Sequence, residues 1–181
     1  MKNKDTMNNI MLDIETLGTG VDSIIIQVAM VKFDWEGNIG KSLTIHFDSY
    51  EEYQLGLTKT KETIDWWNKT NPSLFKVLLT ENLVSVKQGL NKISKFVGAK
   101  DYIWCHATFD APILANLYTK ADIKIPCGFK KVRDIRTLVD LAQLDLSNYN
   151  WDAEKTHDAL DDCRFQIKYC CDAFTRIRTN R

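Results

Sequence analysis

The sequence predicts an α/β protein with a mixed β-sheet of about five strands, an antiparallel hairpin at one side of the sheet, and flanking helices. Two observations favour this fold class. The first quarter of the chain contains apolar and alternating segments that are typical of strands. The remainder shows mainly helical spacing, interrupted by short apolar strands. A length of 181 residues suits a single core of this kind.

Three strands are expected near the N-terminus. Residues 9–14 (NIMLDI) form a short apolar run with acids at its end, as in a buried strand that carries polar groups at its tip. Residues 24–33 are β-branched and apolar, and residues 41–47 alternate between polar and apolar side chains. Residues 34–38 are predicted to form the hairpin turn between these two strands, and the glycine-containing segment 16–20 an earlier turn.

The rest of the chain is predicted to be mainly helical. After an acidic loop at residues 48–52, Thr63 is expected to cap a helix that carries Trp66 and Trp67 and ends near residues 71–72. The other predicted helices are 73–79, 84–97, 111–118, 136–144 and about 158–177, and the other predicted strands are 102–105 and 131–135.

Composition narrows the function classes. The chain has 24 basic and 24 acidic residues, so its zero net charge argues against a protein that coats nucleic acid. No apolar run approaches the roughly 20 residues of a membrane helix, so no membrane partner is expected. Five cysteines without a CxxC pair, together with three histidines, argue against structural zinc and favour a reducing compartment.

Residues 1–8 look like a polar N-terminal leader that lacks the apolar stretch of a signal peptide, and residues 9–181 are expected to form one domain. A cytoplasmic location is expected from these features.

Five residues in three segments are candidates for chemistry. Asp13 and Glu15 lie two apart on a predicted strand, so both point to the same face. Two ionised acids so close together repel each other and are costly to bury unless a cation lies between them. Asp110 follows the fourth predicted strand, and His157 and Asp162 open the last helix.

Each segment also has a simpler interpretation. Acids are common at strand ends, Asp110 could cap the following helix, and acids at a helix start interact favourably with its dipole. The dipole does not explain His157, however. On an ideal helix, His157 and Asp162 would lie about 140° apart. They can converge only if His157 sits in the loop before the helix.

The motifs D-x-E, FD and H-x-A-x-x-D, in this order and at these separations, resemble the DEDDh branch of the DnaQ-like 3′–5′ exonuclease superfamily. The resemblance extends from about residue 9 to residue 174. Residues 63–67, 103–104 and 132–138 further resemble the phage and bacterial group that includes exonuclease VIII and the T-even phage exonuclease A.

This resemblance implies an RNase H-like fold and removal of nucleoside monophosphates from the 3′ end of DNA, with single-stranded DNA as the expected substrate. It also implies two ions of Mg²⁺ or Mn²⁺, a choice that oxygen ligands without sulfur favour. By resemblance, Asp13 bridges the two ions, Glu15 and Asp162 complete one site, and Asp110 holds the second ion through water. His157 is the expected general base.

Six residues are candidate substrate contacts: Thr16, Leu17, Phe109, Trp66, Trp67 and His106. Thr16 and Leu17 resemble the residues that contact the terminal nucleotide in relatives, and an aromatic ring could stack on a base. Adjacent tryptophans on a helix point about 100° apart, so only one of Trp66 and Trp67 is expected to face the substrate. His106 stands where many relatives have Asn, and it either contacts substrate or packs against Trp104.

Other possibilities stay open at this point. The basic residues between Lys120 and Arg136 form either a wall that guides phosphates or an ordinary solvated surface. Asp134 is a candidate supporting acid near the site. The alternative functions are a 3′–5′ exoribonuclease, a non-catalytic nucleic-acid-binding module, and an interaction domain that uses Trp66 and Trp67. A homodimer is possible, because many relatives pair.

Overall fold

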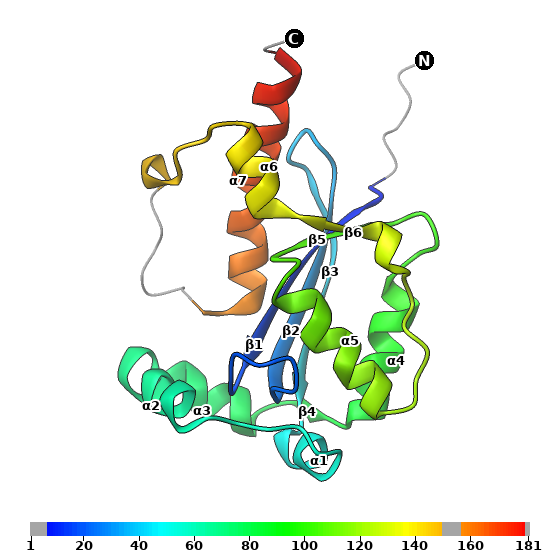
Figure 1. Ribbon diagram of the computed structural model, residues 1–181, viewed down its shortest axis with the longest axis vertical. Helices are drawn as coiled ribbons and strands as arrows, with labels where there is room; N and C mark the ends of the chain where they lie inside the picture. Colours follow the sequence, from blue (N-terminus) through cyan, green and yellow to red (C-terminus); the bar gives the residue numbers. More distant parts are fainter. Residues whose placement is uncertain (1–6, 150–156, 180–181) are drawn as a thin grey trace.

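The computed structural model describes residues 7–149 and 157–179. Most of the predicted leader, residues 1–6, and the last two residues of the predicted domain lie outside the described residues. A six-stranded mixed sheet forms the centre, in the order β4-β3-β2-β1-β5-β6 (Figure 1). The strands are β1 (Asn9–Thr16), β2 (Ile25–Phe33), β3 (Ile39–Phe47), β4 (Leu83–Val84), β5 (Tyr102–Cys105) and β6 (Val132–Asp134).

The predicted fold class is confirmed, with six strands in place of about five. The additional strand, β4, has only two residues, too few for a recognisable pattern. β1, β2 and β3 are antiparallel neighbours, whereas β5 runs parallel to both β1 and β6. The C-terminal ends of β1 and β5 therefore lie at the same edge of the sheet.

The helices are α1 (Ser49–Gln54), α2 (Lys61–Thr70), α3 (Pro72–Thr80), α4 (Val86–Phe96), α5 (Asp110–Lys120), α6 (Ile135–Leu141) and α7 (Ala159–Thr179). Two short 3-10 turns cover Phe129–Lys131 and Leu146–Asn148. None of the helices in the described ranges is long and apolar enough to cross a membrane.

Two local predictions are wrong. The acidic loop after β3 is instead helix α1, because the Asp48 side chain accepts the main-chain N–H of Tyr50 and caps its first turn. Helix α2 begins earlier than predicted, because Thr60 and not Thr63 is its cap: the Thr60 hydroxyl accepts the Thr63 N–H at 3.3 Å. Because Thr60 and Thr63 are both suitable cap residues, the sequence does not distinguish them, and the path of the chain decides which one caps the helix.

Helices cover both faces of the sheet (Figure 1). Helices α6 and α7 pack on one face, over Met11, Ala29 and Val31, whereas α4 and α5 pack on the other, over Ile10 and Leu12. Strand alternation continues the Met11 side into the two acids of β1, so they face α7. This arrangement brings the last helix of the chain onto the acids of the first strand.

The turn after β1 has a glycine at a position where a side chain would clash with a neighbouring residue. Gly18 does not adopt a left-handed conformation, but a Cβ atom there would lie 2.7 Å from the Ser23 hydroxyl. The hydroxyl of Thr16 donates to the Gly18 carbonyl at 2.6 Å, which keeps this turn tight beside the end of β1.

Candidate active site

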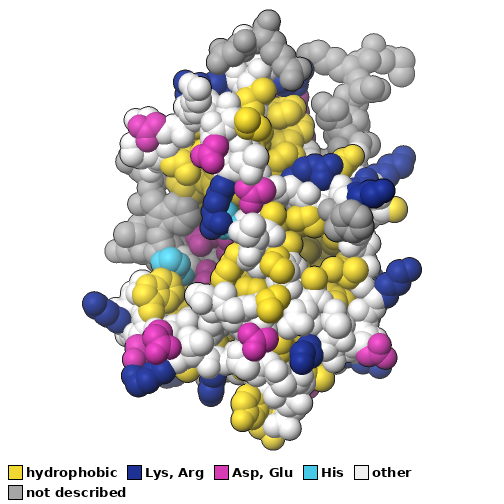
Figure 2. Space-filling view, in the orientation of Figure 1, with side chains coloured by type: hydrophobic (Ala, Val, Ile, Leu, Met, Phe, Trp, Pro, Cys, Tyr) yellow, Lys and Arg dark blue, Asp and Glu magenta, His cyan; other side chains and the backbone are white. Residues whose placement is uncertain are grey.

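Four carboxylates from three segments meet at the C-terminal edge of the parallel strands. They are Asp13, Glu15, Asp110 and Asp162, which are 7%, 8%, 1% and 9% exposed, respectively; we call them the carboxylate cluster. Figure 2 shows acidic and histidine side chains in a hollow of the molecular surface. Acids this deeply buried are unusual unless they are paired or bind a cation.

Asp110 does not cap its helix, so that interpretation is wrong. The cap position of α5 is Phe109, without a side-chain bond, and Asp110 is the first helical residue. Its carboxylate points back and accepts the main-chain N–H of His106 at 2.7 Å. This bond closes the turn between β5 and α5 and holds the carboxylate against the sheet edge.

His157 lies in the turn before α7, as predicted from its spacing to Asp162. Its backbone is left-handed, with φ of 72°, which is uncommon for a residue other than glycine. The main-chain N–H of His157 bonds to the Asp162 carboxylate. Asp158 caps the helix by accepting the N–H of Leu160 at 3.0 Å, which explains this acid without any role in chemistry.

The pKa values of all four acids in the cluster are raised. Burial is the main cause of the raised pKa values of Asp13 and Glu15, and neighbouring carboxylates raise them further. For Asp13 these neighbours are chiefly Asp110 and Asp162, so Asp13 interacts with an acid from each of the other two segments. Burial also raises the pKa of both Asp110 and Asp162 to about 7.

The two histidines beside the cluster are both biased towards the neutral form. Burial lowers the pKa of His106 to about 4, and the positive charge of Arg136 contributes. Burial also lowers the pKa of His157. Neutral imidazoles can accept a proton or bind a metal ion through nitrogen.

Two groups of three side chains have the geometry of a metal site. The first contains Asp13, His106 and Asp110; the second contains Glu15, His157 and Asp162. In each group one ligand atom per residue lies within 4.8 Å of the others. All four carboxylates predicted as metal ligands are thus divided between two adjacent groups, and each group also includes a histidine.

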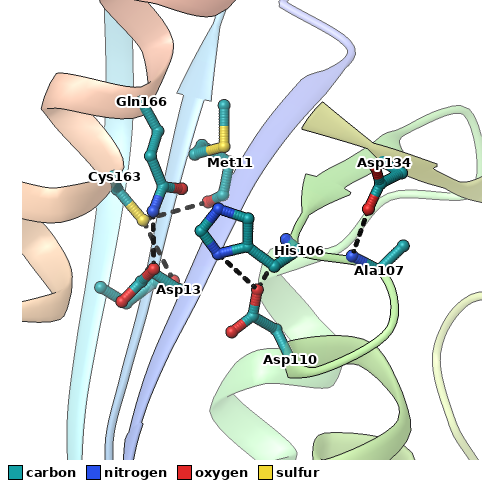
Figure 3. A network of polar contacts seen from close by, with 9 residues as sticks. Met11, Asp13, His106, Ala107, Asp110, Asp134, Cys163 and Gln166 are labelled. Carbon is teal, nitrogen blue, oxygen red and sulfur yellow. Dashed lines mark hydrogen bonds and ion pairs between the residues drawn. The ribbon is translucent and has the colours of Figure 1, made fainter. Parts of the chain in front are cut away.

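Two glutamines that the sequence did not single out support the cluster. Gln166 of α7 donates its amide N–H to Asp13 at 2.7 Å (Figure 3). Gln27 of β2 faces the start of α7, where its amide donates to Asp158 at 3.1 Å and its carbonyl accepts the Ala159 N–H at 2.8 Å. Both contacts join residues more than 130 positions apart, so no local pattern could have revealed them.

Asp134 supports the site, as suggested by the sequence. One of its oxygens accepts the main-chain N–H of Ala107 at 3.0 Å (Figure 3), and the other caps α6 through Thr137. Its pKa is lowered, because these hydrogen bonds outweigh the cost of its partial burial. The loop that carries His106 and Asp110 is therefore attached to β6.

The structure distinguishes the two adjacent tryptophans. Trp67 is 1% exposed, stacks on Phe75, and donates its indole N–H to the Thr16 carbonyl at 3.0 Å. Trp66 is 41% exposed, and its ring meets the His157 ring edge-on with centroids 4.6 Å apart. Trp66 is therefore the tryptophan that lies open beside the site, whereas Trp67 belongs to the core.

The other predicted substrate contacts lie at different depths. Thr16 and Leu17 are buried, at 6% and 4% exposed, and the Leu17 carbonyl accepts the Thr60 N–H. Phe109 is half-buried against the core. The rings of Trp104 and Trp35 meet edge-on at 5.0 Å, while His106 turns towards Asp110.

The basic residues between Lys120 and Arg136 do not act together. Lys131 and Arg133 lie over the ring of Tyr102, at the opposite end of β5 from the carboxylate cluster. Arg136 is the member whose charge acts on Asp110 and His106. The described part of this segment therefore does not support a continuous basic wall.

Comparison with known proteins agrees with this fold. A family model described as a 3′–5′ exoribonuclease Rv2179c-like domain matches residues 8–174. A buried cluster of carboxylates on this fold is typical of hydrolases such as two-metal nucleases. The chain belongs to the Rv2179c-like 3′–5′ exoribonuclease domain family, and the predicted 3′–5′ exonuclease class is confirmed at the level of the family.

Individual relatives extend the comparison. The chain is 27% identical to an exodeoxyribonuclease of Enterobacteria phage T4, over 89% of this chain and 86% of that protein. Exonuclease I from Methylocaldum szegediense shares the fold, with a TM-score of 0.69 at 17% identity over 96% of this chain and 41% of that one. A zinc-bound complex of E. coli exonuclease I with single-stranded DNA has a TM-score of 0.68 at 16% identity, over 93% and 40%.

The chain spans about two fifths of the length of these exonuclease I structures. The fold likeness confirms the RNase H-like architecture. The family match and the phage relative support membership of the broad DnaQ-like exonuclease class. The phage relative agrees with the phage side of the predicted group. The DEDDh branch and the grouping with exonuclease VIII stay predictions.

Proposed function

We propose that this chain removes nucleoside monophosphates from the 3′ end of single-stranded DNA by metal-dependent phosphodiester hydrolysis. The observation that carries the proposal is the carboxylate cluster, four buried acids whose charged neighbours are mainly other acids. Such a group is costly in the absence of a cation and becomes favourable around one. The T4 relative, named an exodeoxyribonuclease, supports DNA as the substrate.

The four carboxylates fit two hard divalent cations, Mg²⁺ or Mn²⁺, because they offer oxygen ligands and neither group of three includes a sulfur donor. We propose that Asp13 lies between the two positions, Glu15 and Asp162 complete one, and Asp110 serves the other. Two bound ions would activate the attacking water, stabilise charge on the phosphate oxygens and assist the leaving 3′ oxygen.

The residues of the chain supply the remaining steps. His157 accepts the proton of the attacking water, since its lowered pKa keeps it neutral near pH 7. Its place in the turn before α7, beside the exposed ring of Trp66, puts it at the rim of the site. This His157 role is the basis for proposing the DEDDh branch. The basis for proposing the exonuclease VIII and exonuclease A group is the resemblance of residues 63–67, 103–104 and 132–138.

For substrate contacts, we propose Trp66 and Phe109 as stacking surfaces for bases. Thr16 and Leu17 line the turn directly after the acids, and we propose that they support the terminal nucleotide mainly by shaping this turn, because little of their surface is exposed. Trp67 supports them from the core through its bond to Thr16. A homodimer and a location in the cytoplasm, of the host if the chain is phage-encoded, stay predictions.

The test uses purified protein with Mg²⁺ and three 5′-labelled substrates: single-stranded DNA, duplex DNA and RNA. A ladder that shortens from the 3′ end, fastest on single-stranded DNA, is the expected result. Internal cleavage fragments would contradict an exonuclease. The Asp13→Asn protein, prepared identically, controls for a contaminating nuclease.

A second candidate, a 3′–5′ exoribonuclease, is favoured by the description of the family itself. The same experiment separates the two candidates. A 3′ ladder on RNA with little degradation of DNA would replace the proposed substrate while leaving the chemistry of the cluster unchanged.

A further inference from the structure

We propose that the imidazole of His106 is a direct metal ligand, so that one of the two metal positions combines Asp13 and Asp110 with a nitrogen donor. This proposal rests on the proposed function, because it concerns one of the two inferred metal positions. It gives His106 a role other than the predicted substrate contact, and none of the three sequence motifs includes it.

The first argument is position. Ligand atoms of Asp13, His106 and Asp110 lie within 4.8 Å of one another, as a shared ion requires after a small contraction. The Nδ1 atom of His106 is 3.9 Å from Oδ2 of Asp110, longer than a hydrogen bond. In Figure 3 the ring lies between the carboxylates of Asp13 and Asp110.

The second argument is that the loop is fixed in place before any ion arrives. The His106 carbonyl accepts the N–H groups of Phe109 and Asp110 at 2.8 and 3.0 Å. The His106 N–H donates to Asp110, and the next N–H, that of Ala107, donates to Asp134. A ligand on such a loop loses little further entropy on binding.

The third argument is the contrast with His157, which belongs to the other group of three. His157 precedes α7 in a left-handed conformation, and its ring meets the exposed Trp66 ring edge-on. His106 instead follows β5, in which half-buried and buried residues alternate, and adjoins Asp110, which is 1% exposed. The two imidazoles therefore serve different purposes: His157 receives a proton at the rim, and His106 binds metal at the base.

A nitrogen donor changes which ions the site prefers. Mg²⁺ prefers oxygen ligands and water, whereas imidazole suits transition metals, with affinity rising from Mn²⁺ towards Co²⁺. The position next to Asp110 is therefore expected to favour Mn²⁺ or Co²⁺ over Mg²⁺. Replacing His106 by Asn should remove this preference while retaining an oxygen donor.

The experiment is pulsed electron paramagnetic resonance of the Mn²⁺-loaded protein with ¹⁵N-labelled histidine. The matched set consists of wild type, His106→Asn, His106→Gln, His157→Asn and His46→Asn, which covers all three histidines of the chain. Calorimetric titrations with Mn²⁺, Co²⁺ and Mg²⁺ accompany the spectra, and circular dichroism verifies that each variant is folded.

The expected result is a nitrogen coupling to Mn²⁺ in wild type that persists in His157→Asn and His46→Asn and is lost in both His106 variants. The affinity of one site for Mn²⁺ should fall at least about 10-fold in those variants, the lower end of the loss seen when even an outer partner of a ligand is removed. Affinity for Mg²⁺ should change much less.

Wild-type protein that binds Mn²⁺ without any nitrogen coupling overturns the proposal, and so does coupling that disappears only in His157→Asn. If both His106 variants fail to fold, coupling that persists in both His157→Asn and His46→Asn assigns the nitrogen to His106 by elimination, because the chain has three histidines. Either outcome leaves the proposed function intact, provided that Mg²⁺-dependent 3′ trimming is observed. Absence of any divalent-ion binding would overturn the proposed function as well, so the two failures are distinguishable.

Discussion

A buried acid lies near each end of strand β5, and the two acids have different neighbours. At the N-terminal end, Asp101 accepts hydrogen bonds from the Lys32 ammonium at 2.7 Å and from the Gly98 N–H at 2.8 Å. At the C-terminal end, Asp110 belongs to the carboxylate cluster, where burial raises its pKa to about 7. Lysine forms an ion pair with the first acid, whereas the second has no ion pair with a lysine or arginine among the described residues, and the nearby charge of Arg136 offsets only part of the effect of burial.

The difference indicates which acids serve the fold and which serve chemistry. A buried carboxylate that only stabilises the fold is expected to lie apart from other buried acids and to have a cationic or main-chain partner. A group of buried carboxylates with raised pKa values, supported by neutral amides such as that of Gln166, leaves the positive charge to be supplied from outside. The predictions below test this distinction, in order of decreasing effect.

The largest effect is expected at the cluster. Asp162→Asn should reduce kcat for 3′ trimming at least about 100-fold, because a lost metal carboxylate removes several kcal/mol of transition-state stabilisation. The measurement is the rate of mononucleotide release in Mg²⁺. Asp161→Asn is the matched control, since Asp161 pairs with Arg164 at the surface. Similar rates for the two variants would contradict the assignment of Asp162.

The opposite pattern is expected at the other end of β5. Lys32→Met leaves Asp101 buried without its cation and should lower the free energy of unfolding on the order of 3 kcal/mol, measured by urea denaturation. Divalent-ion affinity of the folded variant should not change. Lys41→Met, at an exposed position of β3, controls for loss of charge alone. A large loss of metal affinity in Lys32→Met would contradict the view that Asp101 serves only the fold.

The pH dependence of stability should also distinguish the two regions. A carboxyl whose folded pKa is raised holds its proton better in the native state, so metal-free protein should lose stability as pH rises from about 4 to about 7. Each such group contributes up to about 1.4 kcal/mol per pH unit.

Mn²⁺ should reverse this trend, because the cation binds the deprotonated cluster. Melting temperatures at pH 5, 6, 7 and 8, with EDTA or with saturating Mn²⁺, provide the measurement. The gap between the two curves should widen with pH and shrink in Asp110→Asn. Parallel curves would show that the cluster does not bind the ion.

A smaller effect is expected from the amide that supports the cluster. Gln166→Leu removes the hydrogen bond to Asp13 and should lower activity or Mn²⁺ affinity about 10-fold, as losses of outer-shell partners do. Gln88→Leu, on the exposed face of α4, is the control. If both variants behaved like wild type, Gln166 would only fill space.

The smallest effect is expected at the rim. Trp66→Ala should raise KM for single-stranded DNA about fivefold, the lower end of the roughly 1–3 kcal/mol assigned to a base stacked on an aromatic ring. Trp66→Phe should restore most of the loss. An unchanged KM in Trp66→Ala would exclude stacking at this position.

Much of the fold follows from local spacing. The three N-terminal strands, their hairpin and most helices were predicted because apolar periodicity is a property of neighbouring residues. Helix α1 and strand β4 were missed, since the first depends on the Asp48 cap and the second on pairing with β3. Such contacts are made by particular side chains or by distant strands and leave little periodic signal.

The sequence by itself determined the chemical character of the site. Alternation on β1 put Asp13 and Glu15 on one face, and helical geometry required His157 to lie before α7, because both follow from fixed backbone repeats.

Only the tertiary structure decided which residues surround those acids. It brought Gln166 to Asp13, separated Trp66 from Trp67 by burial, and turned His106 towards Asp110. The physical reason is that these contacts depend on how α7 and the loop after β5 pack on the sheet, across separations at which the chain retains no periodicity.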